Sequence, residues 1–273
     1  MVKAFVERHP LLVSLLLALA SFGIAAVSIS VSREPVVSDV QDVAPQDLIP
    51  PTQGEQALSI AWSTENLFWG LVILITVGLL TWFGWWREAG FGWPPRRRNL
   101  HLLVFPALVG VLALSNGVEL RSFWVLLAIV FTVLVVTFGE EALFRGLMLR
   151  LLVPSGVVKA MFLTAVLAGC LRFGASTLAG PWPEAVQATV LSTCGGFTYA
   201  ALRWRTASLW PVFFLHVFVA LALVVSTPGA PLYLALLLLS TLGFVAYGLL
   251  LLRNPSVRAD GGPKPQDSHV RAR

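Results

Sequence analysis

Long apolar stretches, separated by charged or Pro/Gly-rich breaks, are the dominant pattern along the chain. Most of them are long enough for a helix to cross the roughly 30 Å hydrocarbon layer of a bilayer, and they lack the period-two alternation of membrane strands. We therefore expect an all-α, polytopic helical membrane bundle of about eight transmembrane helices. The expected spans lie near residues 10–31, 66–86, 101–116, 122–149, 157–178, 186–202, 207–226 and 231–252.

The breaks divide the chain into three parts. Residues 1–65 are expected to form a first transmembrane helix and an outer loop, because the segment from Arg33 to Glu65 is acidic and contains several prolines. Residues 66–252 are expected to form the membrane core, and residues 253–273 a disordered basic tail. The first helix also has features of a cleaved signal peptide, but its apolar stretch exceeds the usual length, which favours a retained helix.

Composition and charge narrow the class of protein. The chain is 57% hydrophobic and 12% charged, with a mean hydropathy of +0.80, which excludes an ordinary soluble fold. The net charge of +5 comes from short basic clusters beside the spans, so it indicates membrane topology and contact with lipids, with no nucleic-acid partner. Alternating sides through eight spans places nearly all basic residues, and both termini, on the cytoplasmic face. The excess of Arg over Lys and the high Ala and Leu content are typical of a prokaryote. We therefore expect the protein to lie in a prokaryotic plasma membrane.

Other residue types support the same architecture. Most tryptophans lie near span ends and are interpreted as anchors at the headgroup boundary. Cys170 and Cys194 fall inside expected spans and are interpreted as small packing residues, since their spacing suggests neither a disulfide nor a metal site.

A charged cluster at the end of the fourth span is the main candidate for chemistry. The span continues without a helix breaker into Glu140, Glu141 and Arg145. Each ionised group at membrane depth costs about 2.5–3.5 kcal/mol on insertion scales, so such groups are seldom passive. Helical spacing puts Glu141 and Arg145 on one face, close enough for a bidentate ion pair, and turns Glu140 about 100° away. Glu140 would then remain available as a general base or acid.

A simpler interpretation of the same residues stays open. Glu140 and Glu141 would only mark the cytoplasmic end of the span, while Arg145 would extend to the lipid headgroups. Position and charge alone do not separate the two interpretations. Gly139 and Gly146 flank the cluster and would permit close helix contact there.

Two motifs together resemble a known family. Glu140-Glu141-x-x-x-Arg145 at the end of a long apolar span resembles the first motif of the CPBP family, which includes the CAAX prenyl protease 2 and bacteriocin-processing (Abi-type) intramembrane glutamic proteases. Downstream, Thr206-x-Ser-Leu-Trp-Pro211 followed by His216 is similar to the family's helix, short basic turn and next helix. The likeness covers about residues 80–226, and more weakly includes the segment from Arg87 to Trp93.

The resemblance implies roles for individual residues. Glu140 would activate water, Glu141 and Arg145 would support it, and His216 would stabilise the oxyanion. The alternative for His216 is a packed histidine that donates to a backbone carbonyl. The family uses neither metal nor cofactor.

Two positions depart from the family's pattern. Thr177 stands where the second motif, which begins at Phe173, has a histidine, and Ala220 stands where the third motif has an asparagine. Losing an oxyanion donor costs about 10²- to 10³-fold and losing a general base about 10²- to 10⁴-fold. We therefore expect a family member with degenerate second and third motifs, and its catalytic activity is an open question.

Arg172 is an unexpected cation inside the fifth span. It would either pair with Glu140 or Glu141, or face an aqueous cavity or the headgroups. A pair with Glu140 would hold that carboxylate as a structural element.

Several function classes follow from these observations. The first is a membrane-embedded endopeptidase acting on an unidentified peptide or protein, and the second is a catalytically impaired scaffold or binding protein. An ion-coupled transporter lacks support because no internal repeat or pair of broken helices is visible. A zinc protease is disfavoured because Glu140, Glu141 and His216 do not form an H-E-x-x-H run.

Overall fold

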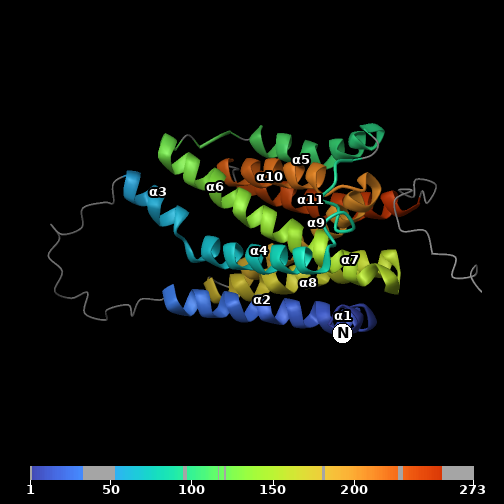
Figure 1. The fold of residues 1–273 in the computed structure, drawn as a ribbon. Coiled ribbons are helices and arrows are strands. Elements are labelled where there is room, and N and C mark those ends of the chain that lie inside the picture. The colour runs from blue at the N-terminus through green and yellow to red at the C-terminus, as the bar shows by residue number, and fades with distance from the viewer. Residues whose placement is uncertain are drawn as a thin grey trace, which may run out of the picture.

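The computed structural model describes residues 2–32, 53–94, 97–115, 117–119, 121–179, 182–226 and 230–253. The described parts are almost entirely helical (Figure 1). The helices are α1 (Val2–Arg8), α2 (Pro10–Ser32), α3 (Gln53–Ala61), α4 (Thr64–Phe83), α5 (Val104–Leu114), α6 (Phe123–Glu140), α7 (Leu149–Leu152), α8 (Val157–Ala179), α9 (Trp182–Thr206), α10 (Trp210–Val225) and α11 (Ala230–Arg253). Two 3-10 segments, η3 (Arg97–Leu103) and η5 (Val153–Ser155), and a π-helical segment, η4 (Glu141–Met148), complete them.

Local capping explains where the fold departs from the expected spans. The Ser63 and Ser122 hydroxyls accept backbone N–H bonds from Asn66 and Val125, and so begin α4 and α6. The expected span 66–86 was wrong at its end: α4 stops at Phe83 because Gly84 takes a left-handed conformation with φ of 70°. The expected tail after residue 253 and most of the acidic loop lie outside the described residues, and the division of the chain at 65 and 252 stays a prediction.

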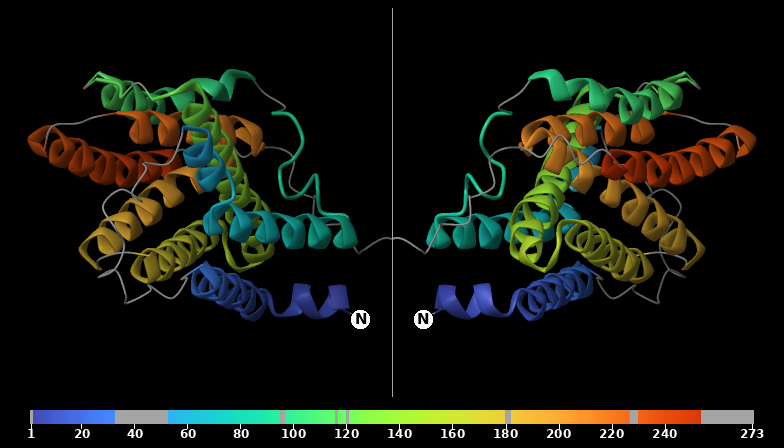
Figure 2. Two further views of the ribbon diagram at one scale, coloured as in Figure 1. Left: turned by 90° about the vertical axis from the view of Figure 1, so that its left-hand side faces the viewer. Right: turned by 90° about the vertical axis from the view of Figure 1, so that its right-hand side faces the viewer.

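The helices form a bundle whose parts meet at η4. In Figures 1 and 2, α2 lies along one side beside α4 and α8, while α5, α10 and α11 lie on the opposite side and α6 runs between the groups. One buried apolar cluster joins α2, α4, η4 and α8, a second joins α7 to α8, α9, α10 and α11, and a third joins α6 to α10. This packing brings α8, α9 and α10 around the end of α6.

The protein is a multi-pass membrane protein with an apolar outer surface. Four helical stretches in the described parts are long and apolar enough to cross a bilayer: Pro10–Val27, Leu58–Phe83, Phe123–Ser155 and Val157–Thr177. Three further apolar helices are shorter: Asn99–Leu114, Trp210–Val225 and Leu238–Arg253. The sixth expected span corresponds to α9, which is long but rich in Thr, Ser, Gln and Arg. Seven apolar stretches therefore match expected spans, and the count of eight is not established.

Polar contacts gather the basic residues at one end of the bundle. The Lys3 ammonium donates to the carbonyl of Phe83 at 3.3 Å, and the Arg203 guanidinium donates to the carbonyl of Glu88 at 2.8 Å. Arg150 forms an ion pair with the Glu88 carboxylate. Three of the basic residues that were expected to share one face, Lys3, Arg150 and Arg203, therefore lie at this end.

The tryptophans do not all serve as anchors. Trp62, Trp82 and Trp182 are exposed, as a residue at the headgroup boundary would be. Trp69 and Trp85 are buried in the core, with 4% and 1% of their surfaces exposed, so for these two the anchor interpretation was wrong. A hydropathy pattern cannot distinguish a tryptophan that faces lipid from one that faces another helix.

Candidate active site

The predicted acidic cluster lies where α6 becomes η4. Glu140 is the last residue of α6 and Glu141 the first of the π-helical segment, which continues without interruption into α7. All eight residues of η4 are buried, and Glu141 is completely inaccessible to solvent. Arg145 is also buried, so the interpretation in which it extends to the lipid headgroups was wrong. π-helical turns are rare in proteins as a whole, but those that occur are often found at functional sites. Sequence analysis did not predict this turn.

Glu141 forms the expected pair with Arg145, but not in a bidentate manner. Arg145 Nη1 lies 3.5 Å from Glu141 Oε1, and both side chains are almost fully buried. The same oxygen lies 2.8 Å from His216 Nδ1, while Oε2 has no hydrogen-bond partner among the described residues. A Cβ atom at Gly196 would come within 2.9 Å of Arg145 Nη2, so this glycine of α9 leaves the space that the guanidinium occupies.

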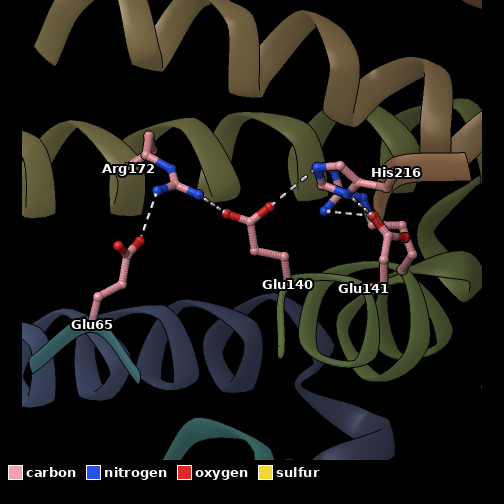
Figure 3. A network of polar contacts seen from close by, with 6 residues as sticks. Glu65, Glu140, Glu141, Arg172 and His216 are labelled. Atoms are coloured by element: carbon pink, nitrogen blue, oxygen red, sulfur yellow. Dashed lines mark hydrogen bonds and ion pairs between the residues drawn. The ribbon is translucent and has the colours of Figure 1, made fainter. Parts of the chain in front are cut away.

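Glu140 is not free, which corrects the expectation that one carboxylate is left available. Its Oε1 forms an ion pair with Nη2 of Arg172 from α8, and Arg172 Nη1 lies 3.4 Å from Oε1 of Glu65 at the start of α4. Its other oxygen, Oε2, faces His216 Nε2 at 3.8 Å (Figure 3). That separation is too long for a direct hydrogen bond. The pairing of Arg172 with Glu140, one of two alternatives, is confirmed.

His216 lies between the two carboxylates. α10 brings its ring next to Tyr199 of α9, with ring centroids 4.7 Å apart. Because an ionised carboxylate only accepts, Nδ1 is the donor toward Glu141 and Nε2 is turned toward Glu140. The contact with a carboxylate replaces the bond to a backbone carbonyl that the alternative interpretation of His216 required. A carboxylate that orients an imidazole in this way fixes both its ring position and its tautomer.

Thr177 does not face the acidic cluster. Its side chain is exposed and its hydroxyl donates to the carbonyls of Phe173 and Gly174 in its own helix. Phe173 is also largely exposed, at 42%. The α8 side chains that line the site are Arg172 and Ser176 instead.

Two cavities meet at the cluster. The larger, of about 440 Å³, lies among α8, α9, α10 and α11, and contains His216, Ala220 and Tyr199 in its wall. The smaller, of about 250 Å³, lies among α2, α4 and α8. Glu140 and Arg172 line both cavities, so their ion pair forms part of the wall between them. The larger cavity is in the size range of small-ligand sites.

The turn before α10 is held by the segment from Glu88 to Gly92. Ser208 Oγ donates to the carbonyl of Gly92 at 2.6 Å, the Leu209 amide to that of Gly90 at 2.7 Å, and Trp210 Nε1 to that of Phe91 at 2.9 Å. Ser208 and Leu209 are fully buried. The Ser-Leu-Trp sequence therefore sets the position where α10 begins. The start of α10 in turn sets the position of His216 relative to the acidic cluster.

The glycines that flank the cluster differ in what they contact. A Cβ atom at Gly139 would come within 2.5 Å of the Trp69 ring, so close contact between α6 and α4 is confirmed there. At Gly146 the nearest atom, from Phe91, would lie 3.5 Å away, so this glycine packs on the connecting segment without need of extra room. Within the described residues, no group of three His, Cys, Asp or Glu side chains is arranged to hold a metal ion.

Comparison with protein families matches residues 122–222 to the Rce1-like family, described as type II CAAX prenyl endopeptidase Rce1-like. Comparison with curated proteins and with solved structures gave no match. The matched segment begins before α6, ends near the end of α10 and contains Glu140, Glu141, Arg145 and His216. The segment from Arg87 to Trp93, which carried a weaker likeness, lies outside it. The segment 122–222 of this membrane protein thus matches the Rce1-like family of type II CAAX prenyl endopeptidases.

Proposed function

We propose that the protein is a membrane-embedded endopeptidase that hydrolyses a peptide bond near the bilayer, with Glu140 as the base and His216 as the oxyanion donor. The observation that carries the proposal is the convergence of Glu140 and His216, from α6 and α10, on one cavity. Glu141 orients the imidazole from the opposite side. The match of residues 122–222 to the Rce1-like family supports the proposal.

The proposed chemistry uses side chains alone. Glu140 Oε2 takes a proton from a water molecule, and the water oxygen attacks the carbonyl carbon of the peptide. His216, when Nε2 carries a proton, donates from Nε2 to the oxygen that becomes negative. When the C–N bond breaks, the proton held by Glu140 passes to the leaving amine, which restores the carboxylate.

The orientation in the membrane is part of the same proposal. Both termini lie in the cytoplasm of a prokaryotic cell, the eight expected helices cross its plasma membrane, with α9 as one of them, and lipids surround the bundle. The gathering of Lys3, Arg150 and Arg203 at one end supports this placement, because cytoplasmic ends carry the excess of basic residues. The peptide or protein substrate then reaches the larger cavity from the bilayer region.

A second candidate function is a scaffold or binding protein without hydrolysis. Ala220 lines the cavity but has no donor for an oxyanion, and Thr177 faces away from it. Glu140 is also held by Arg172, which a purely structural ion pair would require.

Cleavage by the purified protein separates the two functions. The protein would be reconstituted in vesicles with a pool of transmembrane and lipid-anchored peptides of mixed sequence, and products would be identified by mass spectrometry. Glu140→Gln should lower cleavage at least about 10²-fold, as expected when a general base is lost. Glu119→Gln, at an exposed carboxylate paired with Arg121, is the matched control and should cleave like the unchanged protein. Equal cleavage by Glu140→Gln would exclude the proposed mechanism, and no cleavage by the unchanged protein would favour the scaffold.

A further inference from the structure

The α8 side chain that contacts Glu140 is Arg172, which comes one residue before the second family motif, at Phe173. Thr177, at the motif position, is exposed and bonded to its own helix, whereas Arg172 points to Glu140. A cation inside a membrane helix is costly unless it is compensated. Here two carboxylates from different helices, Glu140 and Glu65, compensate it (Figure 3).

The two oxygens of Glu140 have different surroundings. Oε1 is tied to Arg172 Nη2, and Oε2 is directed to His216 Nε2 across 3.8 Å. A carboxylate held by one oxygen cannot rotate freely about its last torsion, so the position of the second oxygen is set by the first. The Arg172 pair therefore determines where the proton-accepting oxygen lies relative to His216.

Glu65 holds the other side of the same guanidinium. It lies in the first turn of α4, half exposed, with Oε1 3.4 Å from Arg172 Nη1. The planar guanidinium presents separate N–H groups to the two carboxylates, so an anchor at Nη1 orients Nη2 toward Glu140. Arg172 itself is only 27% exposed.

We propose that Arg172 is a positioning residue for Glu140, oriented by Glu65, and that it supplies from α8 the support that position 177 does not give. This inference rests on the proposed peptidase function. It goes beyond that function because it assigns a role to an ion-pair chain that joins α4, α8 and α6 at the wall between the two cavities.

Kinetics with three variants test the role. Arg172→Met should lower kcat roughly 10- to 100-fold with little change in KM, as found when partners that orient a reacting group are removed elsewhere. Arg172→Lys keeps the cation and should restore part of kcat. Glu65→Gln, which removes only the outer anchor, should reduce kcat by no more than about threefold, a fraction of the loss for a buried partner.

A charge exchange distinguishes positioning from simple helix linkage. The double variant Arg172→Glu/Glu65→Arg restores a pair between α8 and α4 but puts a negative charge beside Glu140. If Arg172 only links the helices, this variant should regain both melting temperature and kcat. If Arg172 positions Glu140, kcat should stay as low as in Arg172→Met, and recovery of kcat would overturn the inference.

A melting-temperature cycle tests the pair without any need for activity. Arg172→Met, Glu140→Gln and their combination would be compared in detergent. Coupled residues should give a double variant that melts no lower than Arg172→Met, because the second change removes the stranded charge. Additive losses would overturn the positioning of Glu140 whatever the activity. Coupling without wild-type cleavage would instead overturn the proposed function and leave the pairing of Glu140 established.

Discussion

At the scale of single residues, one oxygen atom of Glu141 contacts two other side chains of the site. Its Oε1 faces both Arg145, at 3.5 Å, and His216, at 2.8 Å, whereas its Oε2 and Arg145 Nη1 have no hydrogen-bond partner in the described part of the chain. Buried groups of this kind are costly when left alone. Glu141 therefore couples the charge balance of the cluster to the orientation of the imidazole.

Removing one partner of the buried pair should strand the other. Arg145→Met leaves the Glu141 carboxylate without its cation and should lower the free energy of unfolding by about 3–5 kcal/mol. The paired change Glu141→Gln/Arg145→Met should recover part of that loss, because no charge is left unpaired. Melting in detergent measures both effects, and additive losses for the two changes would contradict a coupled pair.

The imidazole should respond to the same carboxylate. In Glu141→Gln the group opposite Nδ1 is a neutral amide, so the imidazole loses the carboxylate that orients it. We expect kcat to fall about 10- to 100-fold with KM nearly unchanged, the range for lost orienting partners. Peptide cleavage in vesicles measures this, with Glu119→Gln as the control, and unchanged kcat would show that Nδ1 orientation does not matter.

At the scale of elements, two features place the site: the π-helical segment η4 and the connection from Glu88 to Gly92. The first carries the carboxylate and the cation of the buried pair, and the second binds the turn before α10 through three backbone carbonyls. Gly90 belongs to this connection and has a φ of 92°. A Cβ atom there would come within 2.6 Å of the Arg203 guanidinium.

Gly90→Ala should therefore disturb the site from a distance. The left-handed conformation alone costs an L-residue about 1–2 kcal/mol, and displacement of Arg203 adds about 1–3 kcal/mol. Gly84→Ala is the matched control, since Gly84 also has a positive φ, of 70°, but open space around it. We expect Gly90→Ala to lose more stability and more kcat than Gly84→Ala. Equal losses in melting and cleavage assays would show that the contact with Arg203 is unimportant.

At the scale of the whole molecule, three basic residues come together at one end of the bundle. Lys3, Arg150 and Arg203 lie at one end. At the other, the Glu119 amide donates to the carbonyl of Val225, which joins the segment before α6 to the end of α10. In a bilayer, such a distribution would set the orientation of the protein.

Cysteine labelling measures that orientation. In a background where Cys170 and Cys194 are replaced by alanine, Glu119→Cys should react with a membrane-impermeant maleimide in intact cells, because Glu119 is exposed and lies on the outer side in the proposed orientation. Lys3→Cys should react only after permeabilisation. The opposite pattern would invert the topology, and reaction of both in intact cells would exclude a sealed single orientation.

Much of the helical framework could be predicted, because a backbone in lipid must satisfy its own hydrogen bonds and long apolar runs leave few other solutions. The ends were less certain: α4 stops at Gly84, where a glycine conformation outweighs continued apolarity. The spacing of Glu141 and Arg145 also predicted their pairing, since neighbours along one helix face need no tertiary information. The partner of Glu140 could be identified only from the tertiary structure, because the cation that pairs with it comes from another helix.

By itself, the sequence determined that this is a helical membrane protein with an Rce1-like motif set and an acid cluster at the end of one apolar span, since hydropathy and local spacing act along one chain segment at a time. Only the tertiary structure decided that Arg172 pairs with Glu140 and that Thr177 faces away from the acidic cluster. It also decided that Trp69 and Trp85 belong to the core. These outcomes depend on the rotation of each helix about its axis. That rotation is set by packing between helices, which no single segment encodes.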